Sequence, residues 1–179
     1  MGRLALLAAG VFVAAAAPVV SAPPQHVVRG DVRVACQMTV GGSFEARTTA
    51  VSGSVPGELI VDLSTLDAGL SLRTDHMRNT YLEVGKEGGF DKAILSDIRV
   101  AEGPIETVEG RVSFTGTLRL HGTSRMASGR AQIKRKPAGV HIEATVPLTL
   151  TDYGIAKPQY LGVGVKSDVQ IKVSLDVAP

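Results

Sequence analysis

The sequence predicts an all-β domain of about eight antiparallel strands with one short helical insert. The first observation is that apolar residues recur at every second position through most of the chain after residue 22, as expected for strands with one buried and one solvated face. The second is the composition, because 20 glycines, 9 prolines and many valines favour short strands joined by turns. The third is the punctuation of these runs by turn residues such as Gly41-Gly42 and Pro56-Gly57.

The alternating runs give the strands in order along the chain. Alternation is clearest over residues 32–40, 112–120, 140–150 and 169–177. Weaker runs predict four more strands, over residues 44–53, 58–63, 94–100 and 126–133. Eight strands of this kind can close into a barrel or form a two-sheet sandwich, and the alternation does not decide between them.

One segment between the third and fourth predicted strands breaks the alternation. Residues 72–84 have no period of two, and Met77 and Tyr81 are one helical turn apart. Thr74 or Asp75 could cap a first turn. We therefore predict a short helix inserted here.

The inward residues of the predicted strands are mostly of medium size. They are valine, alanine, leucine, isoleucine and glycine, and the chain has no tryptophan. In a barrel, such residues would leave an unfilled volume, and an apolar void of this kind stays dry or accepts an apolar guest. By alternation, the side chains expected to face this lumen are Phe44, Phe114, Leu118, Leu148 and Leu150.

The first 22 residues have the pattern of a secretory signal peptide. One positive charge at Arg3 precedes an apolar run over residues 4–17, which is the length of a signal h-region and short for a membrane span. Cleavage after Val20-Ser21-Ala22 or after Ala14-Ala15-Ala16 would both satisfy the preference for small residues, and an uncleaved anchor is the alternative. We expect export to a periplasm or the cell exterior, with residues 23–179 forming the mature domain.

Composition excludes several classes of function. Nineteen basic and 17 acidic residues give a net charge of +2, without the basic excess of nucleic-acid-binding domains. The single cysteine excludes an internal disulfide framework and a cysteine-rich zinc site. On the apolar side of the first strand, Cys36 is expected to be a buried, inert thiol.

No catalytic or cofactor motif stands out. The sequence has no HExxH, CxxC, GxSxG or P-loop pattern. Four scattered histidines, with His121 and His141 expected to face outward on strands, lack the paired spacing of metal ligands. We therefore expect no catalytic residues, no metal and no cofactor.

The helical insert gathers cationic groups beside apolar ones. Arg73, His76 and Arg78 lie within six residues of one another. A helix across a barrel mouth could use these groups to neutralise an anionic head group. The alternative is a local ion pair between Asp75 and an arginine that fixes the insert.

Several stretches, in order, carry a resemblance to the YceI-like family of polyisoprenoid- or lipid-binding proteins. The most specific is the strand-and-insert block over residues 57–84, with Val61-Asp62-Leu63, Thr65-Leu66, Arg73 and Asp75-His76-Met77-Arg78. Other resembling stretches are Gly42-Ser43-Phe44, Val51-Ser52-Gly53, residues 90–98, residues 116–123 and Asp152-Tyr153-Gly154-Ile155. Together they cover essentially the whole mature chain.

This resemblance implies a fold and a function. The implied fold is a lipocalin-like, eight-stranded antiparallel barrel with a helical insert and an elongated apolar lumen. The implied ligand is a polyisoprenoid or similar long-chain amphiphile, bound by an exported bacterial protein that can form a homodimer.

On this basis, we expect a non-enzymatic carrier or sequestering protein for a long apolar chain. Tyr153 and Tyr160, in the connection before the last strand, are expected at the rim, with Arg73, His76 and Arg78 near the head group. The alternatives are a ligand-free structural or interaction module of the envelope and, less favoured, an enzyme acting on a lipid.

Overall fold

The computed structural model describes residues 25–157, 159–160 and 163–179. The predicted signal segment therefore lies outside the described residues. The main strands are β1 (Gln25–Gln37), β2 (Ser43–Thr48), β3 (Val51–Val55), β4 (Leu59–Asp62), β5 (Lys92–Val100), β6 (Gly110–Leu120), β7 (Thr123–Lys136), β8 (Gly139–Thr149) and β11 (Asp168–Ala178). A short hairpin and four helical turns complete the described elements: β9 (Gln159–Tyr160), β10 (Val163–Gly164), η1 (Leu63–Thr65), α1 (Ser71–Asp75), η2 (His76–Tyr81) and η3 (Leu150–Tyr153).

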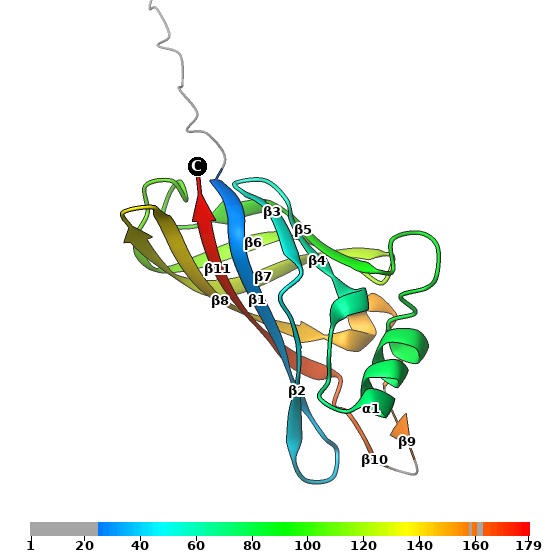
Figure 1. Cartoon of the computed structure of the whole chain (residues 1–179). Helices are drawn as coiled ribbons and strands as arrows, with labels where there is room; N and C mark the ends of the chain where they lie inside the picture. Colours follow the sequence, from blue (N-terminus) through cyan, green and yellow to red (C-terminus); the bar gives the residue numbers. More distant parts are fainter. Residues whose placement is uncertain (1–24, 158, 161–162) are drawn as a thin grey trace, which may run out of the picture.

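The main strands form one closed antiparallel sheet. Its order is β11-β8-β7-β6-β5-β4-β3-β1-β2, and β11 also pairs with β1, with Val32 opposite Val173. Strands β2 and β3 both pair with β1, at opposite ends of it, and so occupy one position in the wall. The result is the predicted eight-stranded barrel with one helical insert, and the sandwich alternative is excluded (Figure 1).

The strand predicted over residues 44–53 is interrupted in the structure. Between β2 and β3, the backbone N–H of Ala50 donates to Thr48 Oγ1 at 3.0 Å instead of to a neighbouring strand. The Thr48 hydroxyl also hydrogen-bonds the Thr65 hydroxyl at 2.5 Å. A side chain that takes over a backbone partner ends strand pairing locally, and alternation alone does not reveal it.

Strand β1 begins seven residues before the predicted start at residue 32. Its pairing with β11 shifts register between Val27 and Arg29. Such a bulge puts two residues opposite one and breaks the period of two. The early part of the strand therefore lacks the alternation that predicts a strand.

The helical insert consists of α1 and η2, which follow one another between β4 and β5. Its predicted caps were wrong. The residue before the first turn is Leu70, which has no side-chain capping bond. Thr74 is buried within α1, where its hydroxyl donates to Asp67 Oδ1 at 2.9 Å and accepts from the Ala68 N–H at 3.0 Å. In this position Thr74 ties the insert to the chain that leads into it.

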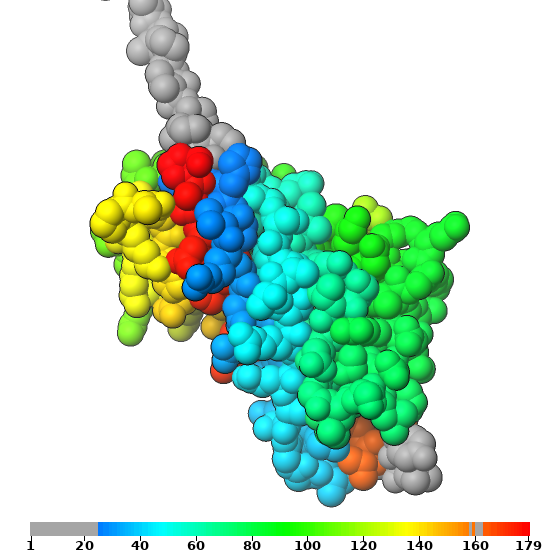
Figure 2. Space-filling view, in the orientation of Figure 1, coloured from blue at the N-terminus to red at the C-terminus, as the bar shows by residue number. Residues whose placement is uncertain are grey.

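The insert, the β1–β2 tip and the β9–β10 hairpin gather at the same end of the barrel (Figure 1). The Gln159 N–H donates to the Tyr81 hydroxyl at 3.2 Å, which joins the hairpin to η2. The Thr39 N–H donates to the Gly164 carbonyl at 2.7 Å, which joins the β1–β2 connection to β10. The space-filling view shows the insert packed beside the β1–β2 segment on the face in view (Figure 2).

Candidate functional site

The barrel encloses a cavity of about 750 Å³. Its wall is built by inward residues of the strands and by the insert. Four of the five predicted lumen residues are on this wall: Phe44, Leu118, Leu148 and Leu150. This volume is in the range that holds a small-molecule ligand.

The wall is almost entirely aliphatic. Among the described residues that line the cavity there is no aspartate, glutamate, lysine, serine or threonine. The polar side chains on it are those of Cys36, Arg73, His76, Tyr81 and Gln159. A dry apolar tube with few polar groups favours an apolar chain over a polar metabolite.

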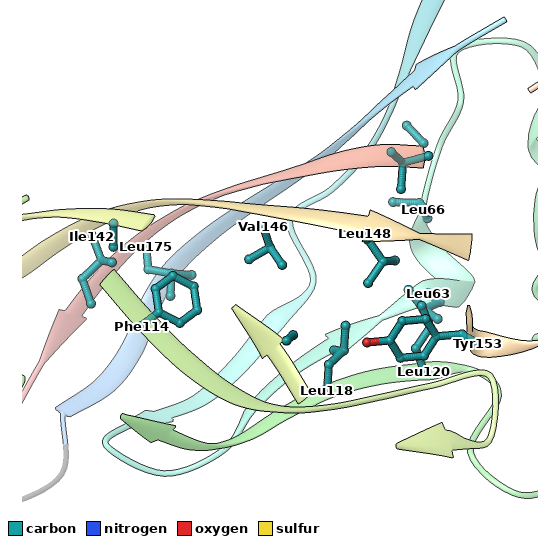
Figure 3. Close-up of a cluster of buried hydrophobic side chains, with 14 of the residues drawn as sticks. Leu63, Leu66, Phe114, Leu118, Leu120, Ile142, Val146, Leu148, Tyr153 and Leu175 are labelled. Carbon is teal, nitrogen blue, oxygen red and sulfur yellow. The ribbon is translucent and has the colours of Figure 1, made fainter. Parts of the chain in front are cut away.

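Phe114, the fifth predicted lumen residue, lies beyond the cavity rather than on its wall. It faces inward and is buried, but its ring packs in the part of the barrel that also holds Ile142 and Leu175 (Figure 3). A Cβ at Gly129, on the neighbouring strand, would lie 2.7 Å from Phe114 Cζ. The absence of that atom gives the ring its space, and the ring fills one end of the barrel.

The cavity opens at the opposite end, beside the insert. Leu70 and Leu72 both line the cavity, yet they are 59% and 68% exposed. Val163 of β10 lines it as well and is 37% exposed. Side chains that touch both the cavity and solvent mark the mouth.

Arg73 brings a permanent positive charge to this mouth. Its guanidinium carbon lies 4.3 Å from the centroid of the Phe44 ring, and its Nη1 donates to the Ala68 carbonyl at 3.2 Å. Burial raises the pKa of the Cys36 thiol to about 11, against a smaller opposing effect of the Arg73 charge. Arg73 is the one permanently charged residue among the described residues of the wall. His76, the next predicted head-group residue, also lines the cavity.

The structure places the other two predicted rim residues that it describes away from the cavity. Arg78 donates from Nε to the Leu66 carbonyl at 2.8 Å and does not line the cavity, because its side chain braces the insert. Tyr153 is 3% exposed and packs in the core, and burial raises the pKa of its phenol. The side chain of Tyr160 lies outside the described part of the chain. The alternative for the insert, an ion pair of Asp75 with an arginine, is not among the ion pairs of the described residues.

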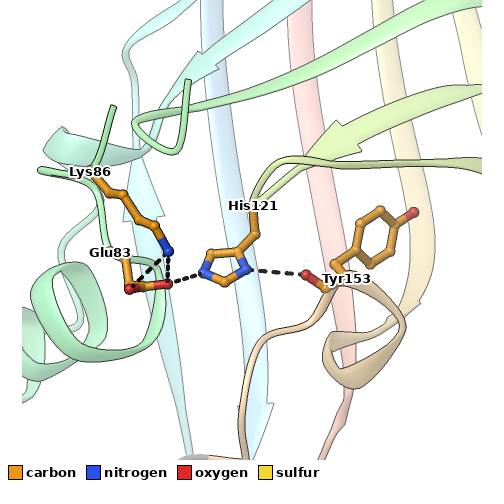
Figure 4. A network of polar contacts seen from close by, with 4 residues as sticks. All are labelled: Glu83, Lys86, His121 and Tyr153. Carbon is orange, nitrogen blue, oxygen red and sulfur yellow. Dashed lines mark hydrogen bonds and ion pairs between the residues drawn. The ribbon is translucent and has the colours of Figure 1, made fainter. Parts of the chain in front are cut away.

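His121 was expected on an outward strand face, but it instead links two segments at the mouth end of β6. It sits in the β6–β7 turn with a φ of 50°. Its Nε2 lies 3.0 Å from Glu83 Oε2, and its Nδ1 lies 3.2 Å from the Tyr153 carbonyl oxygen (Figure 4). The ring also makes an edge contact with Phe90, with ring centroids 4.6 Å apart. His121 thus joins the end of the insert to η3.

The alternation argument missed the contribution of the insert to the wall. Met77, Tyr81 and Leu82 line the cavity although they belong to no strand. The spacing of Met77 and Tyr81, one helical turn apart, was the available signal for a shared apolar face.

The comparison that decides the family is a match to the family model described as YceI-like domain, over residues 23–177. The chain belongs to the YceI-like family. A search of curated proteins found no match to this sequence. Among solved structures, this YceI-like chain is similar to a polyisoprenoid binding domain from Saccharophagus degradans implicated in plant cell wall breakdown. That pair has a TM-score of 0.65 and 16% identity, covering 87% of this chain and 98% of the other.

A second solved structure similar to this YceI-like chain is Burkholderia cenocepacia BcnA. It has a TM-score of 0.62 and 15% identity, covering 84% of this chain and 96% of BcnA. At these identities the likeness shows a shared barrel fold.

Metal sites and membrane spans were sought in the part of the chain that the structure describes. It holds no group of three or more histidine, cysteine, aspartate or glutamate side chains placed to bind a metal ion. Within the same residues, no helix is both long and apolar enough to cross a membrane.

Proposed function

We propose that this YceI-like protein binds a polyisoprenoid or similar long-chain amphiphile, as a carrier or sequestering protein rather than an enzyme. The observation that carries the proposal is the aliphatic cavity of about 750 Å³, closed by packed side chains at one end and open at the other. Each methylene moved from water into such a tube contributes roughly 0.8 kcal/mol. A long chain therefore needs no polar contact along most of its length.

The orientation of the ligand follows from where the charges lie. The Phe114 end of the barrel is apolar and packed, and Arg73 and His76 lie on the wall near the mouth. We place the end of the chain toward Phe114 and the polar head beside Arg73. A phosphate or another acceptor-rich head group suits a guanidinium best.

The family and the fold support this class of ligand. The chain matches the YceI-like model over residues 23–177, and one structural neighbour is a polyisoprenoid binding domain. The cavity of the present chain supplies the physical reason why the same class would fit here.

Native mass spectrometry of the protein purified from its host, followed by organic extraction, tests the proposal. We expect one long-chain lipid per protein. A matched pair of variants tests whether the lipid lies in the cavity. Ala127→Trp places an indole ring in the cavity from its wall, and Ser128→Trp places the same ring on the outer face of β7. Ala127→Trp should lose the lipid and Ser128→Trp should keep it. An empty wild-type protein that also fails to take up added isoprenoids would instead indicate a ligand-free envelope module.

We further propose that the protein is exported, since residues 1–22 have the order of charge, apolar run and small residues of a signal peptide. Mass determination of the mature protein from fractionated cells tests this. Export predicts a periplasmic or secreted chain that begins after Ala16 or Ala22, and a cytoplasmic chain that retains Met1 or Gly2 would contradict it.

A further inference from the structure

Exposed apolar side chains gather around the cavity mouth. Six large apolar residues of the described chain are exposed, five of them by more than half and Val163 by 37%: Val28, Val40, Leu70, Leu72, Met126 and Val163. Four of these six belong to the β1–β2 tip, α1 with the residue before it, and β10. Single exposed apolar residues are ordinary, but a group on adjacent segments marks an interaction surface.

Contacts between backbone segments hold this group together. Leu70, Leu72 and Val163 all line the same opening. Val40 follows Thr39, which makes two hydrogen bonds with Gly164. The Thr39 N–H donates to the Gly164 carbonyl at 2.7 Å, and the Gly164 N–H donates to Thr39 Oγ1 at 2.9 Å. The β1–β2 tip is thereby held against β10. We call Val40, Leu70, Leu72 and Val163 the mouth rim.

The charges beside the mouth rim favour an anionic partner. Lys157 and Lys166 are exposed at the two ends of the β9–β10 segment, and Arg73 lies on the cavity wall. No described residue forms an ion pair with any of these three cations. Exposed acidic side chains also lie near them in the chain, among them those of Asp67, Asp75 and Asp168. Two of these already accept hydrogen bonds: Asp67 from the Thr74 hydroxyl and Asp168 from the Thr149 hydroxyl.

We propose that the mouth rim docks on a lipid membrane whose surface carries anionic head groups. This rests on the proposed function, because the rim is continuous with the cavity that would hold the chain. A long apolar chain that left a bilayer through water would lose its favourable burial, whereas a rim dipped into the bilayer passes the chain directly into the tube. Aliphatic side chains flanked by lysines are the usual composition of an interfacial membrane contact.

A tryptophan reporter tests the docking directly, because the chain has no tryptophan of its own. Val40→Trp places the reporter on the mouth rim, and Val28→Trp places it near the other end of β1 at a similar exposure, 65% against 71%. With vesicles of phosphatidylcholine and phosphatidylglycerol, the Val40→Trp emission should shift to the blue and be quenched by brominated acyl chains. The Val28→Trp emission should do neither. Equal responses, or no response from Val40→Trp, would overturn the proposal.

Paired substitutions test the same surface without a reporter. Leu70→Ser with Leu72→Ser should lower the vesicle partition coefficient by at least about tenfold, since two leucines no longer enter the bilayer. Val28→Ser with Met126→Ser is the matched control and should leave it unchanged. Lys157→Gln with Lys166→Gln should remove the preference for phosphatidylglycerol. A rim pair that partitions like the control pair would contradict the docking.

Uptake of geranylgeraniol in the absence of vesicles separates this inference from the proposed function. Uptake without any vesicle response would overturn the docking and leave the proposed function intact. A vesicle response without uptake would overturn the proposed function and leave the docking surface standing.

Discussion

The Arg73 guanidinium lies over the face of the Phe44 ring, with its central carbon 4.3 Å from the ring centroid. The contact joins the helical insert to strand β2 across the mouth of the cavity. It is attractive because the ring face carries partial negative charge. A hydrogen bond from Nη1 to the Ala68 carbonyl also holds the guanidinium. The charge is therefore fixed in place, ready to meet a head group without first being ordered.

Replacing Arg73 by glutamine should weaken binding of geranylgeranyl phosphate much more than binding of geranylgeraniol. Loss of a charge-assisted hydrogen bond costs about 1.5–3 kcal/mol, which corresponds to a tenfold or greater loss of affinity. Calorimetric titration with the two ligands measures the difference.

Arg78→Gln is the matched control, because Arg78 is on the same insert but braces the Leu66 carbonyl instead of lining the cavity. It should lower the melting temperature and leave the ratio of the two affinities unchanged. Equal losses for both ligands in Arg73→Gln would show that Arg73 acts only on the structure of the insert.

Cys36 offers a label inside the cavity. Burial raises the pKa of its thiol to about 11, and the reactive form is the thiolate, so alkylation should be slow at neutral pH and accelerate as the pH approaches that value. Bound ligand should slow it further, since Cys36 lines the cavity. Reaction with a maleimide, followed by intact mass with and without isoprenoid, measures both effects. Alkylation as fast as in the urea-unfolded chain would contradict the burial of the thiol.

Alternation could predict the strands and their inward faces because each strand keeps its inward residues in phase, and the resemblance to the YceI-like family supplied the choice of a barrel over a sandwich. Leu118 and Leu148 are placed correctly on the wall by alternation alone. The strand bounds could not be predicted where tertiary contacts override the local alternation. The side chain of Thr48 interrupts one strand, and the bulge at Val27 and Arg29 hides the start of another.

The site was harder to predict because a side chain that points into the barrel does not necessarily line the cavity. Alternation puts both Phe114 and Leu118 inside, but only the depth along the barrel decides which of them packs and which faces the cavity. The arginines of the insert show the same limit. Arg73 and Arg78 are five residues apart, and their different roles depend on the positions of Phe44 and the Leu66 carbonyl in space.

The packing of Phe114 against Gly129 should be sensitive to one added methyl group. In Gly129→Ala, the new Cβ would lie 2.6 Å from the Thr145 carbonyl oxygen and 2.7 Å from Phe114 Cζ. Backbone cannot yield as a flexible side chain does, so we expect a loss of about 1–3 kcal/mol in the free energy of unfolding. Urea titration measures this loss. Gly85→Ala is the matched control, since Gly85, like Gly129, does not have a positive φ, and a Cβ there would meet nothing within 4 Å.

Phe114 also sets how deep the cavity runs. Phe114→Ala should cost about 3–5 kcal/mol because it leaves a void in the core. The same void should extend the cavity. Lipids extracted from this variant should therefore have longer chains than those from the wild type, or the preference of the protein for shorter-chain lipids should fall. Unchanged chain lengths in a folded Phe114→Ala protein would show that the barrel collapses onto the vacated space.

Asp176 should give the barrel an acid-sensitive contribution to stability. Hydrogen bonds from Lys136 and then His141 hold the pKa of Asp176 below its ordinary value of 3.8. A carboxyl whose pKa is lower in the folded state stabilises the fold at pH values above its unfolded pKa, and this stabilisation is lost as the pH falls through the folded pKa. The melting temperature of the wild type should therefore fall more steeply below about pH 4 than that of Asp176→Asn. Lys136→Gln should raise the Asp176 pKa in a carbon-detected NMR titration, because Lys136 is the largest cause of the shift. Lys134→Gln, on the same hairpin but paired with Glu143, should leave that titration unchanged.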